Sequence, residues 1–136
     1  MPLDKSALSE RVLPIAKSLA HSFGSRIDLI NVVPTISEDI PEEFIVQASE
    51  EAEAYLKEIH DALSAELGPE RVGSSVQRGY PASVIIEQAE SQDDSLVLMS
   101  THGYTGVQRL LLGSLAGKVV QAAATPVLLV PADAKN

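Results

Sequence analysis

The feature that most constrains the fold is an alternation of helix-type and strand-type segments along the whole chain. Apolar residues recur at helical spacing over four segments: 6–24, 42–67, 81–90 and about 114–124. Short apolar runs between and after them predict strands over 26–34, 72–79, 95–100 and 125–131. Such alternation is typical of an α/β domain. It predicts an open parallel sheet with helices on both faces.

Proline and glycine mark the expected ends of these helices. Gly24 and Gly68 are suited to stop the first and second helices, and Pro81 is suited to the first turn of the third. Pro14 lies inside the first helical pattern, where it removes a hydrogen-bond donor. We therefore expect that helix to bend or to start late.

The beginning of the chain departs from the usual α/β order. A domain of this kind normally opens with a strand, but only Met1, Pro2 and Leu3 precede Asp4. The first strand is therefore expected to be truncated. Three explanations stay open: the real start lies upstream, the strand is vestigial, or something else fills its place in the sheet.

Composition limits the size of the domain and its partners. A chain of 136 residues with 45% hydrophobic content is long enough for one domain, over residues 1–136, and too short for two. It carries 19 acidic and 10 basic residues, a formal charge of -9. Such a charge repels nucleic acid and anionic membranes. We therefore expect neither as a partner.

Cysteine content and hydropathy narrow the chemistry and the compartment. The sequence has no cysteine, which excludes disulfides and thiolate or redox catalysis. The first residues mix charged and apolar types, unlike a signal peptide. No apolar run approaches the roughly 18 residues that a membrane helix needs. We expect a soluble, cytoplasmic protein.

Residues 100–120 are rich in glycine but match no standard phosphate-binding loop. A Walker-type loop has four residues between its glycines and a Ser or Thr after its lysine. Here three residues separate Gly113 from Gly117, and Lys118 is followed by Val119. The G-x-G-x-x-G fingerprint is absent as well. Lys118 is most simply a solvent-facing lysine of a helix.

The glycines that remain allow two interpretations. Gly103 is followed by nine residues and then by Gly113-Ser114, between a buried strand and a helix. Glycine lets the backbone approach a phosphate, and Ser114 at a helix N-cap would add a hydroxyl and the positive helix end. Alternatively, Gly103 and Gly106 are turn residues and Ser114 caps its own helix. Spacing alone favours this second interpretation.

Several ordered motifs together resemble the universal stress protein family. The main match is Ser100-Thr101-His102-Gly103, nine residues, and Gly113-Ser114, followed by a helix and the strand 126–130. Two further matches lie at expected strand ends, Pro2-Leu3-Asp4 and Asn31-Val32-Val33-Pro34, and a third, Gly79-Tyr80-Pro81-Ala82, at the turn into the third helix. The chain is identified as a member of this family on all of them together.

The resemblance implies a fold, a ligand and an assembly. The expected fold is a five-stranded parallel, Rossmann-like domain of the adenine nucleotide alpha hydrolase type. Members act in the stress response and are often homodimers, and one branch binds ATP with a divalent cation, here Mg²⁺ or Mn²⁺. Such a site agrees with the rule that ligands bind at the carboxyl ends of strands in open α/β sheets.

The resemblance also implies site residues. Asp4 would meet the ribose or the metal and phosphates, Val32 the adenine, and Met99 the base and sugar. The phosphates and ribose would be held by Gly103, Gly113, Ser114 and the Leu115 amide. Pro2, Leu3 and Ser100 complete the expected nucleotide-binding set. Which residues would hold the metal is left open.

Each assignment has a simpler alternative or a departure. Asp4 could merely cap the first helix, and Val32 and Met99 would be core residues in any fold of this class. Ser100 replaces a family glycine, which restricts the backbone near the ligand. Lys5 also replaces a glycine, and could either block the turn or supply a cation to the phosphates.

Two functions follow, and an enzymatic one is disfavoured. The first is an ATP-binding regulatory protein; the second is a dimeric interaction module of the same fold that binds no nucleotide. In a dimer, strand 125–131 would pair with its copy, unless helices cover it and Pro126 and Pro131 prevent pairing. As candidates for acid/base catalysis we find only Asp4 and His102, so at most slow ATP hydrolysis is expected.

Overall fold

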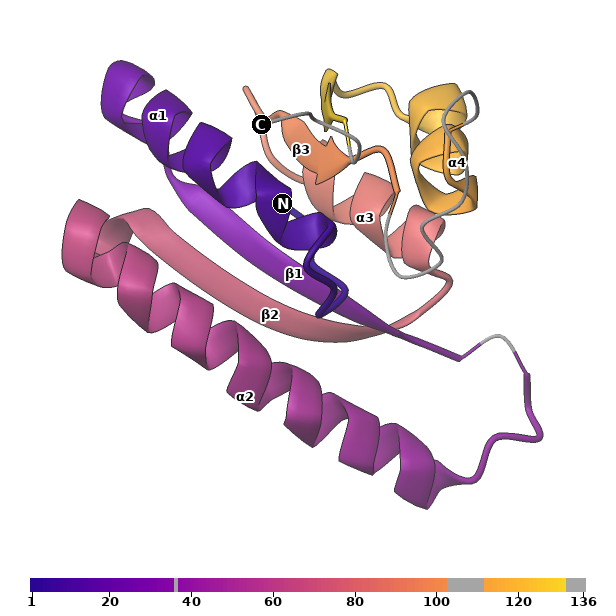
Figure 1. The fold of residues 1–136 in the computed structure, drawn as a ribbon. Helices are drawn as coiled ribbons and strands as arrows, with labels where there is room; N and C mark the ends of the chain where they lie inside the picture. Colours follow the sequence, from indigo (N-terminus) through magenta and orange to yellow (C-terminus); the bar gives the residue numbers. More distant parts are fainter. Residues whose placement is uncertain (36, 103–111, 132–136) are drawn as a thin grey trace.

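The computed structural model describes residues 1–35, 37–102 and 112–131, and its four strands form two parallel pairs (Figure 1). β1 (Ile27–Pro34) pairs with β2 (Val72–Gly79). β3 (Val97–Ser100) pairs with β4 (Val127–Val130). The strands alternate with helices along the chain, which confirms the predicted parallel α/β class.

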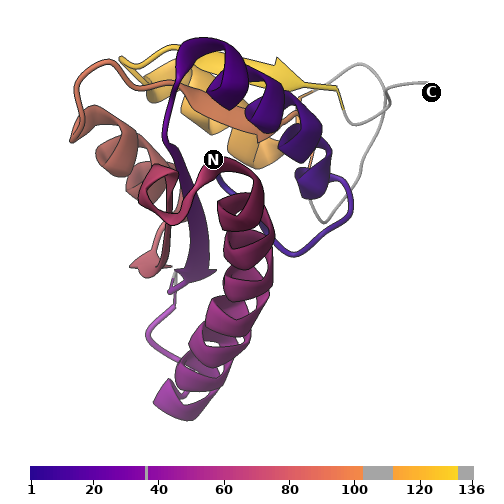
Figure 2. The same ribbon diagram turned by 90° about the vertical axis from the view of Figure 1, so that its left-hand side faces the viewer.

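Helices cover both faces of the sheets (Figures 1 and 2). α1 (Leu13–Phe23) and α2 (Glu42–Leu67) enclose one apolar core, with Leu29 and Leu56 among its fully buried side chains. α3 (Pro81–Glu90) and α4 (Ser114–Ala122) enclose a second core around Val119. This coverage explains why β1 and β3 are largely buried on both faces.

The first predicted helix starts late, as Pro14 suggested. A short 3-10 turn, η1 (Ser9–Val12), precedes α1, and Pro14 occupies the first turn of α1, where its missing N–H costs no hydrogen bond. Gly24 ends the helix at φ 66°, a left-handed conformation that glycine adopts without strain. A second 3-10 turn, η2 (Pro69–Arg71), follows α2.

Among the described residues, the strands do not form the expected single sheet of five, and residues 1–3 make only an isolated bridge. Pro2 makes an isolated parallel bridge to Ile30. The Ile30 amide donates to the Met1 carbonyl at 3.1 Å, and the Leu3 amide donates to the Ile30 carbonyl at 2.9 Å. Residues 1–3 therefore extend the β1–β2 sheet, while β3 and β4 remain a separate pair.

Other predicted bounds agree with the structure or shift slightly. α2, β2 and α3 have the predicted limits. β3 starts two residues later than predicted, β4 is shorter at both ends, and α4 ends at Ala122 rather than at residue 124. Within the described ranges, no helix combines the length and apolarity needed to cross a membrane.

Candidate functional site

A cleft of about 510 Å³ opens where β1 and β3 end, next to the start of α4. It contains every predicted site residue that the structure describes: Pro2, Leu3, Asp4, Val32, Met99, Ser100, Gly113, Ser114 and Leu115. Gly103 lies outside the described residues. Segments far apart in the sequence therefore meet in one hollow, at the place where open α/β sheets bind ligands.

Asp4 is positioned by the turn that follows the short first strand. Its carboxylate accepts hydrogen bonds from the Ser6 amide at 2.9 Å and from the Ser6 hydroxyl. The Asp4 amide donates to the Ser9 hydroxyl at 3.3 Å. The capping alternative is wrong, because Leu8 occupies the N-cap of η1 without a side-chain bond. The carboxylate instead orders a turn at the rim of the cleft.

The same turn depends on a buried asparagine, for which the sequence motif predicted no role of its own. Asn31 is 6% exposed, and its Nδ2 donates to the Leu3 carbonyl at 2.8 Å. The bond connects β1 to the residue immediately before Asp4. An asparagine inside an apolar strand was a visible signal, but its partner could not be read from the sequence.

Lys5 does not block the turn, although its backbone is strained. The residue adopts φ 73°, a region that non-glycine residues rarely occupy. Its Nζ lies 3.8 Å from Glu51 Oε2 on α2, and the residue lines the cleft. At the position of the family glycine, the chain thus has a lysine with a left-handed backbone conformation, and its side chain places a positive charge at the rim of the cleft.

The end of β3 is buried and hydrogen-bonded. Ser100 is 6% exposed, and its hydroxyl donates to the His102 carbonyl. The Thr101 amide donates to the Val130 carbonyl of β4 at 2.9 Å. The Gly113 amide donates to the Thr101 carbonyl, also at 2.9 Å. The serine that replaces a family glycine therefore holds the local backbone, and His102 also lines the cleft.

Gly113 is required where it stands, for a packing reason. A Cβ on this residue would lie 2.9 Å from the Thr101 carbonyl oxygen and 3.4 Å from His102 Cα. Both are backbone atoms, which cannot move aside as a flexible side chain can. The close approach fixes the entry into α4 beside the end of β3.

The expected serine cap of α4 is wrong by one residue. Gly113 is the N-cap, it makes no side-chain capping bond, and Ser114 is the first helical residue. The first bond of the helix joins the Gly117 amide to the Gly113 carbonyl. In a helix the first-turn amides have no intrahelical acceptor and carry the positive end of the dipole. The start of α4, in the wall of the cleft, is suited to an anion.

The remaining wall of the cleft is apolar. Met99 is buried and Val32 is half-buried, and both also belong to the core around α3 and α4. Ile85, Pro81 and Ala116 extend this wall. Val32 and Met99 are therefore core residues, as the simpler alternative predicted, and they also line the cleft. The cleft combines an apolar side with the start of α4 and a carboxylate at its rim.

No three acidic, histidine or cysteine side chains gather as a metal site in the described ranges. His60 Nε2 instead lies 3.2 Å from the Val72 carbonyl, on the far part of α2.

Comparison with known proteins assigns the family. The model of the universal stress protein family matches residues 1–131. The chain belongs to the universal stress protein family. This family member is 31% identical over 145 residues to Universal stress protein MJ0531 of Methanocaldococcus jannaschii, across 100% of this chain and 82% of the relative.

Solved structures confirm the fold of this universal stress protein. Universal stress protein UspA from Lactobacillus plantarum superposes with a TM-score of 0.82 at 18% identity, over 95% of this chain and 93% of that one. A universal stress protein crystallised in complex with cAMP gives a TM-score of 0.73 at 20% identity, over 98% and 94% of the two chains. The Rossmann-like α/β fold expected from the sequence is thereby confirmed.

Proposed function

We propose that the cleft binds an adenine nucleotide, ATP together with Mg²⁺ or Mn²⁺, and that the protein is a regulator of the stress response. One observation carries this function. The glycine-capped start of α4 and the Asp4 carboxylate share a single cleft with an apolar wall. An adenine nucleotide needs these three surfaces for its phosphates, its ribose and its base.

The cleft offers a surface for each part of the nucleotide. The apolar side chains of Val32 and Met99 would contact the adenine and sugar. The amides at the start of α4, from Ser114 and Leu115, would receive the phosphates, since they lie at the positive helix end. Asp4 would meet the ribose or the metal. A cleft of about 510 Å³ lies within the usual range for small-molecule sites.

Two further facts support a nucleotide in this cleft. A structural relative with the same fold was crystallised with cAMP, which is an adenine nucleotide. Lys5 adds a cation beside the turn that carries Asp4. A bound Mg²⁺ or Mn²⁺ ion would neutralise phosphate charge, and the Asp4 carboxylate, which lines the cleft, could contact it.

The same residues favour binding over rapid turnover. General acid/base catalysis needs a side chain positioned to exchange a proton with the reacting atoms. The Oδ1 atom of Asp4 accepts both hydrogen bonds from Ser6 and so orders the turn instead. We therefore propose at most slow ATP hydrolysis. Fast, saturable phosphate release that disappears in Asp4→Ala would overturn this assignment.

A dimeric interaction module without a nucleotide is the second candidate. In the described part of the chain, β4 has only β3 as a strand neighbour, so its other edge is free of a strand. Leu128 on β4 is 39% exposed, and Val120 of α4 is 43% exposed. An exposed apolar edge strand readily pairs with a copy of itself, although Pro126 and Pro131 flank it. We propose a homodimer through β4, to be checked by light scattering.

Calorimetry with ATP and Mg²⁺ separates the two candidates. Gly113→Val places side-chain atoms against the Thr101 carbonyl, so binding should be lost. Gly117→Val, one turn along α4, is the matched control because its Cβ would meet no atom within 4 Å. Circular dichroism checks that both variants fold. No binding by the wild type would favour the interaction module, whereas binding that neither variant changes would place the nucleotide away from the start of α4.

A cytoplasmic location belongs to the same proposal, because ATP is a cytoplasmic ligand. Cell fractionation with an antibody to the protein tests it.

A further inference from the structure

Lys5 keeps a backbone conformation that suits a different residue type. Its φ angle is 73°, in the left-handed region where any side chain other than that of glycine is strained. Glycine, which the family pattern has at this position, would adopt the same angle without strain. Strained residues persist where the surrounding structure holds them, and they cluster at ligand sites. The strain therefore points to a use for the Lys5 side chain.

This side chain brings a permanent positive charge to the cleft. Of the residues that line the cleft within the described ranges, Lys5 is the one lysine or arginine and Asp4 is the one acidic residue. The chain as a whole carries a formal charge of -9, which opposes the approach of an anion. Among these lining residues, a phosphate group would therefore find its cationic partner in Lys5.

A loose ion pair connects Lys5 to α2. Its Nζ lies 3.8 Å from Glu51 Oε2. An N–H···O hydrogen bond is shorter, about 2.7–3.2 Å between the heavy atoms. The two side chains are 39% and 57% exposed, so water screens their attraction. The contact restrains the lysine without fixing it.

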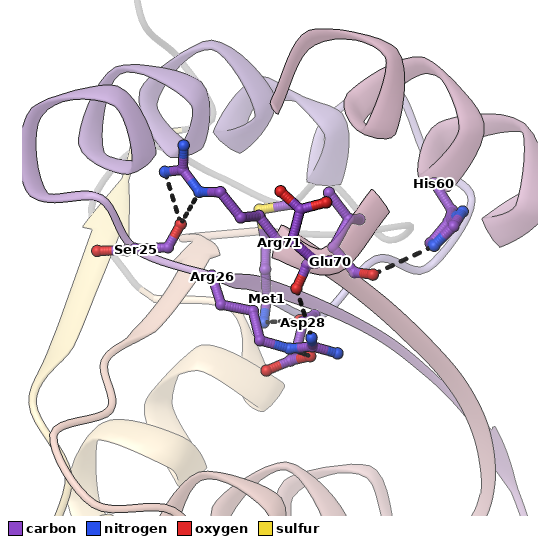
Figure 3. Close-up of polar contacts among 8 residues, drawn as sticks. Met1, Ser25, Arg26, Asp28, His60, Glu70 and Arg71 are labelled. Carbon is purple, nitrogen blue, oxygen red and sulfur yellow. Dashed lines mark hydrogen bonds and ion pairs between the residues drawn. The ribbon is translucent and has the colours of Figure 1, made fainter. Parts of the chain in front are cut away.

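A cation with a fixed position is held differently. Arg26 donates to the Asp28 carboxylate at 2.9 Å and to the Glu70 carbonyl at 3.0 Å, so two bonds hold its guanidinium group next to the start of β1 (Figure 3). In the described part of the chain, Lys5 has one longer contact, and its ammonium group ends a flexible stem of four carbons. Of these two cations, Lys5 is the one that can change its partner easily.

Glu51 is placed to share the lysine with a ligand in the cleft. It lies one turn after Ala48 on the same face of α2, and Ala48 lines the cleft. The other oxygen of its carboxylate, Oε1, accepts a hydrogen bond from Gln47 Nε2 at 3.2 Å. Because the carboxylate keeps this partner when the lysine leaves, the exchange needs no movement of α2.

We propose that Lys5 exchanges Glu51 for a phosphate group when a nucleotide binds, so that Glu51 competes with the ligand for the lysine. The exchange rests on the proposed nucleotide function of the cleft, and it makes Lys5 and Glu51 the pair that sets the affinity for the charged part of the ligand. A terminal phosphate carries more negative charge than a carboxylate and has three acceptor oxygens, so it attracts the ammonium group more strongly. Occupancy of the cleft then leaves the Glu51 carboxylate without its cation.

Such an exchange distinguishes ligands by their charge. Adenosine has the base and sugar of ATP but no phosphate, so it would leave the pair between Lys5 and Glu51 intact. Substitutions at either residue should therefore change the affinity for ATP and leave the affinity for adenosine unchanged. If the pair only stabilised the fold of the cleft, the two affinities would change together.

Calorimetry of the full chain with ATP and Mg²⁺, and separately with adenosine, tests the exchange. Lys5→Met removes the charge but keeps a long unbranched side chain, and should weaken ATP binding about tenfold. Glu51→Gln removes the competing charge and should strengthen ATP binding about two- to fivefold. Glu50→Gln makes the same charge change at the next exposed residue of α2. It is the matched control and should change the affinity less than about twofold.

A double variant and NMR show whether the two residues act through each other. When Lys5→Met and Glu51→Gln are combined, the gain from Glu51→Gln should disappear, because no lysine is left to compete for. In the wild type, the resonance of the Glu51 carboxyl carbon should shift with ATP and Mg²⁺ and stay in place with adenosine. Circular dichroism checks that each variant folds.

Failure of the exchange and failure of the nucleotide site give different results. ATP binding that either Lys5→Met or Glu51→Gln leaves unchanged would overturn the exchange while the nucleotide site stands. Equal effects of these substitutions on ATP and adenosine would overturn it as well. No binding of either ligand by the wild type would overturn the nucleotide site and the exchange with it.

Discussion

The buried Asn31 side chain donates a hydrogen bond to the Leu3 carbonyl across 2.8 Å, and this bond fixes the residue next to Asp4. It joins the second strand segment of the chain to the first at the point where the candidate nucleotide cleft begins. The position of the acidic rim of the cleft therefore depends on an amide in the core.

Removing this amide should weaken both stability and ligand binding. Asn31→Ala leaves the Leu3 carbonyl without its side-chain donor, at a cost of about 1–3 kcal/mol in the free energy of unfolding. Affinity for ATP should fall with it, since Asp4 follows Leu3. Urea unfolding and calorimetry measure the two effects. Gln47→Ala, which removes an exposed side-chain bond to Glu51, is the control, and equal behaviour of both variants would contradict this role.

Replacing Lys5 by glycine should stabilise the protein. A left-handed backbone costs a non-glycine residue about 1–2 kcal/mol, and the exposed pair with Glu51 contributes no more than about 1 kcal/mol. Lys5→Gly should therefore raise the free energy of unfolding by up to about 1 kcal/mol. Lys5→Ala serves as the control, because it loses the ion pair but keeps the strain. A Lys5→Gly variant no more stable than Lys5→Ala would show that the turn carries no strain.

The glycine at the N-cap of α4 and the glycine inside this helix should respond in opposite ways to alanine. Gly113→Ala forces a Cβ against the Thr101 carbonyl and should cost about 1–3 kcal/mol. Gly117→Ala meets open space inside α4 and should gain up to about 1 kcal/mol from helix propensity. Thermal and urea unfolding of the pair provide the check. Stabilisation by both substitutions would contradict the close approach at Gly113.

The buried amino group of Met1 should make stability depend on pH. Its pKa falls from 8.0 to about 6 on folding, so between these values the unfolded chain binds more protons than the folded one. Stability should therefore rise from pH 6 to pH 8, by roughly 2–3 kcal/mol at most. Urea unfolding is compared between the chain with a free Met1, verified by mass, and the same chain acetylated there. An identical pH dependence of the two forms would rule out the amino group as its source.

Glycine and proline residues at helix ends explain why much of the fold could be predicted from the sequence. Gly68 and Pro81 bound α2 and α3, so these helices have the limits that residue types and periodicity predict. Pro14 likewise indicates the late start of α1. Each of these signals acts on the backbone within one turn, and no distant contact is needed to read it.

The split sheet and the Asn31 contact could not be predicted in the same way. Strand pairing depends on residues far apart in the chain, and a three-residue strand gives too little pattern to show whether it pairs with one neighbour or two. The Asn31 partner lies 28 residues away, at Leu3. The N-cap of α4 is Gly113 rather than the predicted Ser114. Side-chain capping preferences favoured the serine, and they do not reveal the tight contact between Gly113 and Thr101.

The candidate site was predicted mainly through ordered motifs. The cleft brings together the described members of that set, from Pro2 to Leu115, although spacing within the glycine segment alone favoured simple turns. No local pattern predicted the roles of Ser6, Ser9 and Asn31. These polar residues make hydrogen bonds that fix the backbone around Asp4.

The most direct test of the central claim is an NMR titration of the folded protein with ATP and Mg²⁺. Nucleotide binding in the cleft predicts saturable amide shifts at Asp4, Val32, Met99, Ser114 and Leu115. The amides of Gln88, Gln92 and Ser95, which do not line the cleft, should stay unchanged. Shifts confined to these three residues, or no shifts at millimolar ATP, would contradict a nucleotide site at the start of α4.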